Sequence, residues 1–108
     1  ALHLSPLDPQ KYYFEMMLAT SCLAVGQMQR AIDLCVSSLK KNRYHLPTIR
    51  TLLIAQYEAD AKEEAVSTFN LLRTLQPDLT VSKYLSSGNQ SPLRRRGAKV
   101  FSALGMPN

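Results

Sequence analysis

The feature that most constrains the fold of this chain is a recurrence of landmark residues at intervals of 34 positions. A fixed period of this length indicates stacked structural repeats, each of which is one supersecondary unit. With 108 residues, the chain has room for one domain built from such units. The recurring landmarks are Leu18 and Leu52, Gly26 and Asp60, Ala31 and Ala65 and, at twice the interval, Pro9 and Pro77.

Between these landmarks, apolar residues recur three and four positions apart, which is the periodicity of a helix. Asp8-Pro9 and Pro47 are helix start signals, and Gly26 and Pro77 are stop signals. No segment alternates with the period of two that indicates a strand. The predicted helices cover residues 12–25, 28–41, 47 to the turn at 60, 63–75, 80–86 and about 92–104. Because the turns are short, we expect an all-α fold of antiparallel helix pairs.

Each of the four long helices has an apolar face that is predicted to lie in the core. These faces comprise Phe14, Leu18 and Cys22; Ile32, Cys35 and Leu39; Ile49, Leu52, Leu53 and Tyr57; and Val66, Phe69, Leu72 and Leu75. Two cysteines do not make a disulfide scaffold, so Cys22 and Cys35 are interpreted as small buried hydrophobes in a reducing compartment. We therefore expect a cytoplasmic protein.

The period and the landmarks resemble the tetratricopeptide repeat (TPR), a helix–turn–helix unit of about 34 residues. The matching positions are Leu18 and Leu52 in the first helix, Ala31 and Ala65 where the two helices approach closely, Phe69 in the second helix and Pro77 at the end. The resemblance implies a superhelix of two repeats, 12–45 and 46–79. It also implies that residues 1–11 are the end of a preceding repeat.

Segments on both sides of the repeats are similar to the C-terminal TPR segment of bacterial class III adenylate/guanylate cyclase-like proteins. These segments are residues 4–9 (LSPLDP, followed by an aromatic pair), 77–85 (PDLTVSKYL) and 104–108 (LGMPN). Related TPR tails also occur behind winged-helix transcription regulators. The resemblance implies an accessory region of a larger bacterial regulatory protein, with any catalytic residues upstream of this chain.

The net charge of +5 is carried entirely by the C-terminal residues 80–108, because the eight basic and eight acidic residues of 1–79 cancel. Lys99 stands where a third repeat would need a small residue, so we expect 80–108 to cap the last repeat instead. The cluster of Arg94, Arg95, Arg96 and Lys99 is a candidate site for phosphates or an anionic surface. The alternative is that it forms an ordinary solvated helix face.

The first helix of each pair is expected to line the concave side of the stack, where a partner would bind. The predicted groove residues are Tyr13, Met16, Thr20, Leu23, Arg50, Ile54 and Tyr57. Their mixture of apolar, aromatic and basic side chains suits an apolar peptide or helix with one acidic contact. The alternative is that the neighbouring copy of the repeat packs against Tyr13 and Met16.

No arrangement of residues typical of catalysis is evident: the glycines are isolated, and no phosphate-binding loop, nucleophile elbow or metal-ligand cluster occurs. No apolar run approaches the ~20 residues of a membrane span. We therefore predict no enzymatic activity, cofactor, metal or small-molecule substrate for this chain. We predict a protein–protein interaction or self-association module. The alternatives are binding of nucleic acid or an anionic surface through the basic tail, and a purely structural end cap.

Overall fold

The residues that the structure describes form six helices and no strand. The structure is a computed structural model, and it describes residues 11–86 and 92–108. The helices are α1 (Lys11–Ala24), α2 (Met28–Lys41), α3 (Leu46–Glu58), α4 (Lys62–Leu75), α5 (Val81–Ser86) and α6 (Pro92–Leu104). The all-α prediction is thereby confirmed. Residues 1–10, assigned to a preceding repeat, and the predicted loop and helix cap within 87–91 lie outside the described residues.

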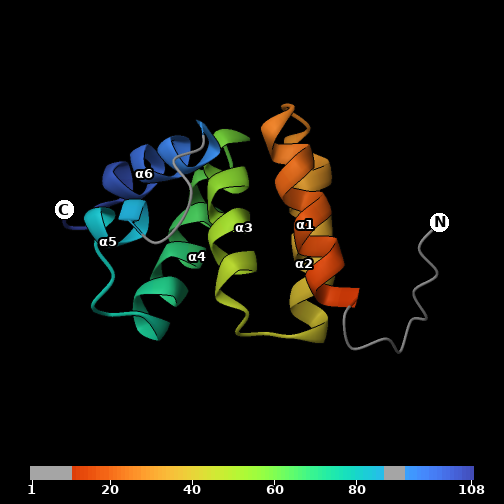
Figure 1. Ribbon diagram of the computed structural model, residues 1–108, viewed down its shortest axis with the longest axis horizontal. Coiled ribbons are helices and arrows are strands. Elements are labelled where there is room, and N and C mark those ends of the chain that lie inside the picture. Colours follow the sequence, from red (N-terminus) through yellow and green to blue (C-terminus); the bar gives the residue numbers. More distant parts are fainter. Residues whose placement is uncertain (1–10, 87–91) are drawn as a thin grey trace.

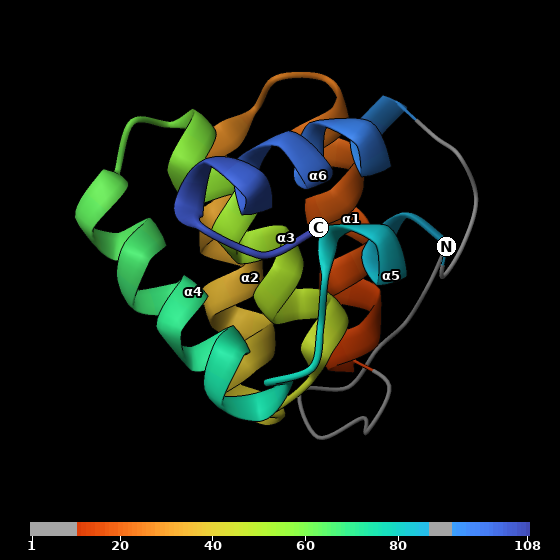
Figure 2. The same cartoon turned by 90° about the vertical axis from the view of Figure 1, so that its left-hand side faces the viewer.

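The first four helices stand side by side as two antiparallel hairpins (Figure 1). Helix α1 packs along α2, α3 packs along α4, and α2 packs along α3 to join the two hairpins. Helix α6 runs across the second hairpin, where it contacts α3, α4 and α5 (Figure 2). Within the described ranges, no helix combines the length and the hydrophobicity that crossing a bilayer would require.

The two hairpins repeat each other at the interval of the sequence landmarks, down to individual backbone hydrogen bonds. The amide of Gly26 donates to the carbonyl of Leu23 at 3.2 Å. The amide of Asp60 donates to the carbonyl of Tyr57, also at 3.2 Å. Both turn residues have left-handed backbones, with φ of 88° and 66°. Since α2 and α4 also begin and end at this same interval, the sequence period corresponds to a structural period.

Equivalent small and apolar positions are buried in both hairpins. They are Ala31 and Ala65, Cys35 and Phe69, and Ser38 and Leu72. Alanine at the first pair lets the two helices of a hairpin approach closely, because its side chain is only a methyl group. Burial raises the pKa of the Cys35 thiol to about 12, so this cysteine remains a protonated, unreactive core residue.

Helix α3 occupies the centre of the molecule, in contact with α1, α2, α4 and α6. From Thr48 to Gln56 every residue except Arg50 is buried. A helix that is covered on nearly all sides needs an almost continuous apolar surface. The run of Leu52, Leu53, Ile54 and Ala55 provides that surface.

Two of the predicted apolar faces are wrong in part. Leu18 and Val66, assigned to the core, are 40% and 46% exposed. On α1 the buried side chains are instead Glu15, Met16, Ala19 and Leu23. The prediction assumed that the largest apolar stripe of α1 would face inward. The helix instead turns its inner side toward α2, α3 and the C-terminal segment, and no described helix covers Leu18.

The C-terminal segment folds back onto the second hairpin as a cap. The amide of Val81, at the start of α5, donates to the carbonyl of Pro107 at 2.8 Å and so joins the two ends of the segment. The rings of Tyr84 and Phe101 meet edge to face with centroids 4.7 Å apart. Gly97 allows close contact, because a Cβ there would overlap the Tyr84 hydroxyl and lie 2.8 Å from Cδ1 of Ile54.

A polar contact links the two hairpins at the start of α3. The Ser38 and Thr48 hydroxyl oxygens lie 3.4 Å apart, and Nδ1 of His45 lies 2.8 Å from the Thr48 hydroxyl. Burial, with a smaller contribution from the charge of Arg50, lowers the pKa of His45 below its usual value of 6.5. The fold therefore favours the neutral imidazole at this position.

Reciprocal substitutions at the two equivalent turns should change stability in opposite directions. A left-handed backbone costs about 1 kcal/mol for a residue with a side chain but little for glycine. Asp60→Gly should therefore raise the free energy of unfolding, and Gly26→Asp should lower it, by about that amount each. A Cβ at Gly26 would meet no atom within 4 Å, so its cost is conformational. Urea denaturation tests this, and two changes of the same sign would contradict it.

The lowered pKa of His45 predicts a pH-dependent stability. As the pH falls below about 6.5, the unfolded chain takes up a proton that the folded chain resists, so the free energy of unfolding decreases until the pH passes the folded pKa. Urea titrations of the wild type and His45→Gln between neutral and mildly acidic pH isolate this contribution, since both chains share all other groups. The wild type should lose more stability on acidification. Parallel curves would contradict the assignment.

Candidate functional site

Two adjoining cavities lie where α1 and α3 meet the C-terminal helices. The smaller has a volume of about 210 Å³ and the larger about 560 Å³. Arg50, Tyr84 and Arg94 line both cavities, so the two are parts of one cleft, which we call the α3–α5 cleft. Its walls come from helices that are distant in sequence.

The smaller cavity contains much of the groove that the sequence predicted. Five of the seven predicted groove residues line it: Met16, Thr20, Leu23, Arg50 and Ile54. However, Met16, Leu23 and Ile54 are almost completely buried, so they belong to the core and not to an open surface. The reason is that the chain's own C-terminal helices return to this face, where Tyr84 and Leu93 form part of the wall. Met16 is therefore buried, as the alternative expected, but the C-terminal helices line the cavity beside it together with the neighbouring repeat.

Of the two remaining groove residues, Tyr57 does not line either cavity. Tyr57 is half-buried at the end of α3, where the Lys62 ammonium lies 3.5 Å from the centre of its ring. The side chain of Tyr13 lies outside the described part of the chain. The predicted groove is therefore reduced to a cleft centred on Arg50.

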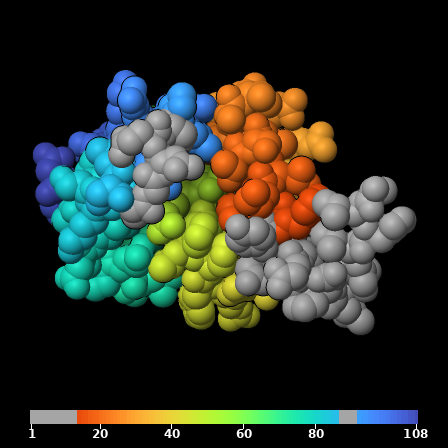
Figure 3. Space-filling view, in the orientation of Figure 1, coloured from red at the N-terminus to blue at the C-terminus, as the bar shows by residue number. Residues whose placement is uncertain are grey.

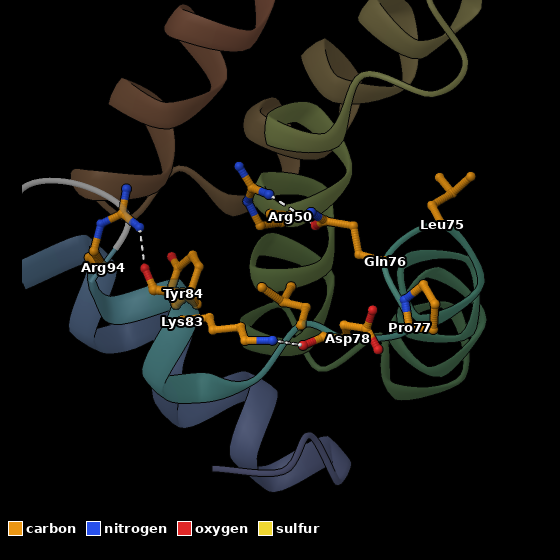
Figure 4. A pocket seen from close by; sticks show the side chains of 9 residues that line it. Arg50, Leu75, Gln76, Pro77, Asp78, Lys83, Tyr84 and Arg94 are labelled. Atoms are coloured by element: carbon orange, nitrogen blue, oxygen red, sulfur yellow. Dashed lines mark hydrogen bonds between the residues drawn. The ribbon is translucent and has the colours of Figure 1, made fainter.

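The larger cavity is basic. Arg50 from α3, Lys83 from α5 and Arg94 from α6 converge on it, and Asp78 is the one acidic residue among the described residues that line it (Figure 4). Gln76 and Pro77, from the connection between α4 and α5, form another part of the wall. Three cations against one carboxylate give this part of the cleft a positive potential.

Like Arg94, and unlike the exposed Lys83, Arg50 is half-buried. Its Nη1 donates to Oε1 of Gln76 at 3.3 Å (Figure 4), and no carboxylate among the described residues forms an ion pair with it. Burial and the neighbouring charge of Arg94 lower the pKa of Arg50, while Tyr84 acts in the opposite direction. The guanidinium remains charged at neutral pH. Within the described structure its side-chain hydrogen bond goes to the neutral amide of Gln76, and no carboxylate compensates its charge.

The other two cations are held against the backbone of the C-terminal segment. Nη1 of Arg94 donates to the carbonyl of Tyr84 at 2.7 Å, and its guanidinium lies 4.8 Å from the centre of the Tyr84 ring. Nζ of Lys83 donates to the carbonyl of Asp78 at 2.9 Å. Burial raises the pKa of Tyr84, opposed by Arg94 and Arg50, so the phenol is neutral at physiological pH.

The basic tail does not form a single surface. Arg96 uses Nε to bond Oε2 of Glu58 at 3.1 Å, and its Nη1 donates to the carbonyl of Leu23 at 3.3 Å. This side chain joins α6 to the C-terminal ends of α1 and α3, which places α6 beside α1 at the surface (Figure 3). Arg94 faces the cleft, whereas Arg95 and Lys99 are exposed. The predicted four-residue cluster is thus divided among three environments.

Sequence reasoning missed Lys83, Tyr84 and Gln76 as members of the site. The sequence indicates Lys83 and Tyr84 only as members of the predicted helix 80–86 and of the segment 77–85, and it does not single out Gln76. Nothing in the repeat period indicates that α5 turns back toward Arg50. Within the described ranges, no group of three His, Cys, Asp or Glu side chains could hold a metal ion.

No protein-family model matches this chain, and no curated protein or solved structure matches it significantly. The description of the site therefore depends on the geometry of this structure alone.

Arg96 and Arg95 provide a matched test of which part of the basic tail is structural. Arg96→Ala should lower the free energy of unfolding by about 1–2 kcal/mol, because it removes charge-assisted hydrogen bonds and leaves Glu58 without its cation. Arg95→Ala, one position away and exposed, should change it by less than about 0.5 kcal/mol. Urea denaturation measures both, and hydrogen exchange should show faster exchange of α6 amides in the first variant only. Equal effects would contradict the assignment.

Proposed function

We propose that this chain is a protein–protein interaction module built from TPR-like hairpins. The observation that carries the proposal is an exposed apolar stripe on the outer side of α1. Its apolar members are the half-buried Phe14 and the exposed Met17 and Leu18, and the polar Ser21 continues the same helical face three and four positions further along. Met17 and Leu18 are 52% and 40% exposed. We call these four residues the α1 stripe.

The equivalent stripe on α3 supports an interface at this place. The positions one repeat further along the chain from the α1 stripe are Thr48, Thr51, Leu52 and Ala55, all of which are buried. Thr48 contacts Ser38 of α2, so this side of α3 packs on the preceding hairpin. Residues that are covered in one copy of a repeat and open in the other are suited to receive another helical element.

The TPR assignment is supported by the structural period of the two hairpins and by the buried alanines at the crossing of each hairpin. A place at the C-terminal end of a larger bacterial regulator, including the cyclase-like class, is supported by the sequence resemblance of the flanking segments. Two free cysteines, Cys22 and Cys35, support a reducing, cytoplasmic location. Reading the coding sequence upstream of Ala1 tests the parent: a metal-binding catalytic domain favours the cyclase-like class, and a winged helix favours a transcription regulator.

A structural role as an end cap has its own support, because α5 and α6 cover the second hairpin. The contact between Val81 and Pro107 and the anchor from Arg96 to Glu58 hold this cover in place. In the proposal the cap and the interface are compatible, since they lie at opposite ends of the repeats. Nucleic-acid binding through the tail has less support, because Arg94 and Arg96 are engaged by the chain itself.

The α1 stripe predicts a specific loss of association. Met17→Asp combined with Leu18→Asp should abolish self-association or partner binding, because a helix interface cannot bury two unpaired carboxylates without a large cost. Light scattering after size exclusion measures self-association, and a pull-down from nuclease-treated bacterial extract measures partner binding. Leu71→Asp, at an exposed leucine of α4, is the matched control. A wild-type chain that neither self-associates nor retains a specific protein would overturn the proposal, as would equal loss in the control.

A further inference from the structure

The α3–α5 cleft holds a half-buried cation whose charge no described carboxylate balances. The Arg50 guanidinium donates a hydrogen bond to the side-chain oxygen of Gln76. The two groups whose charges affect the pKa of Arg50, Tyr84 and Arg94, also line the cleft. Removing a guanidinium from water is unfavourable unless it gains an anionic partner. Lys83 and Arg94 line the same cavity, so an anion entering it would meet three positive side chains.

The shape of the cleft indicates a ligand that is larger than a simple ion. The basic cavity of about 560 Å³ adjoins the smaller cavity of about 210 Å³ at Arg50. The smaller cavity is lined by the apolar side chains of Met16, Leu23, Ile54 and Leu93 and by polar side chains that include Thr20 and Thr51. A ligand that fills both parts must carry an anionic group close to an apolar one. An acidic residue beside an apolar residue in a polypeptide has this arrangement.

The distribution of charge favours carboxylates over nucleic-acid phosphates. Binding of a nucleic-acid strand uses a row of exposed cations that follows the backbone, together with stacking surfaces. Here Arg95 and Lys99, the exposed cations of α6, do not line the cleft. Of the two guanidinium groups that line both cavities, Arg94 donates to the carbonyl of Tyr84, and the planar fork of Arg50 matches the two-oxygen geometry of a carboxylate.

We propose that the α3–α5 cleft binds an acidic segment of a partner protein, with a carboxylate on Arg50 and Lys83 and an adjacent apolar side chain in the smaller cavity. This inference depends on the proposal that the chain binds proteins, but it assigns a second surface. The α1 stripe lies on another face of α1, so the two surfaces can be tested separately.

Fluorescence anisotropy with a short labelled peptide of alternating leucine and glutamate tests the inference. The wild type should bind it with an affinity that falls as salt rises, and the counterpart with glutamine in place of glutamate should bind at least about tenfold more weakly. Arg50→Gln should weaken binding of the acidic peptide by a similar factor. Lys83→Gln, on the rim of the cleft, provides a second variant that keeps the test valid if Arg50→Gln does not fold, which circular dichroism reports.

Lys99→Gln is the matched control, because it removes an exposed cation of the same tail that does not line the cleft. It should leave peptide binding unchanged, as should the double substitution in the α1 stripe. Loss of self-association or partner binding in the α1 variant with intact peptide binding would separate the two surfaces. The inference is overturned if the wild type does not bind the acidic peptide, or if the glutamine peptide binds equally well. It is also overturned if Lys99→Gln weakens binding as much as Lys83→Gln does, or if an oligothymidine of similar length binds more tightly than the acidic peptide.

Discussion

The burial of α3 on nearly all of its sides is the constraint on which the rest of the structure depends. This helix contacts the first hairpin, its own partner α4 and the C-terminal helix α6. An isolated helical hairpin cannot cover both faces of its first helix, so each repeat needs a neighbour. In this chain α3 obtains one neighbour from the preceding hairpin and the other from a non-repeating segment. Among the described residues no hairpin precedes α1, so the α1 stripe stays exposed.

The C-terminal segment determines the character of the site as well as the stability of the last hairpin. By folding back over α3, it helps to enclose a small cavity of mixed apolar and polar lining beside a larger basic one. Close contact at Gly97 and the bridge from Arg96 to Glu58 make this return possible. Two of the arginines that give the tail its high charge thus serve the fold and the cleft. The basic cluster at residues 94–99 suggests a separate binding surface in the sequence. In the fold its side chains have different neighbours, so they do not form one surface.

The two proposed surfaces differ in the physical basis of recognition. The α1 stripe offers apolar area and would be recognised mainly through the hydrophobic effect, with little dependence on salt. The α3–α5 cleft offers a half-buried cation and would be recognised through charge and hydrogen bonding, with a clear dependence on salt. A module with both surfaces could be stacked on other helical elements at one end while binding an acidic segment at its side.

Much of the fold could be predicted from local rules. The helix boundaries follow from Gly26, Pro47 and Pro77 and from the spacing of apolar residues, because a helix depends on contacts three and four residues apart. The left-handed turns at Gly26 and Asp60 follow from the same rules applied once in each repeat. Which stripe of a helix faces inward is less local, and for Leu18 and Val66 the prediction was wrong because burial depends on which neighbour is present.

The sequence by itself determined the helices, their pairing into hairpins and the repeat period, since each depends on residues close together along the chain. Only the tertiary structure decided that α5 and α6 return to α3. That return buries Met16 and Ile54 and brings Lys83 and Arg50 into the lining of one cavity. These contacts join residues that are far apart along the chain, and no periodic pattern specifies them. They arise because the last repeat must cover its apolar face, and the segment available to cover it carries basic side chains.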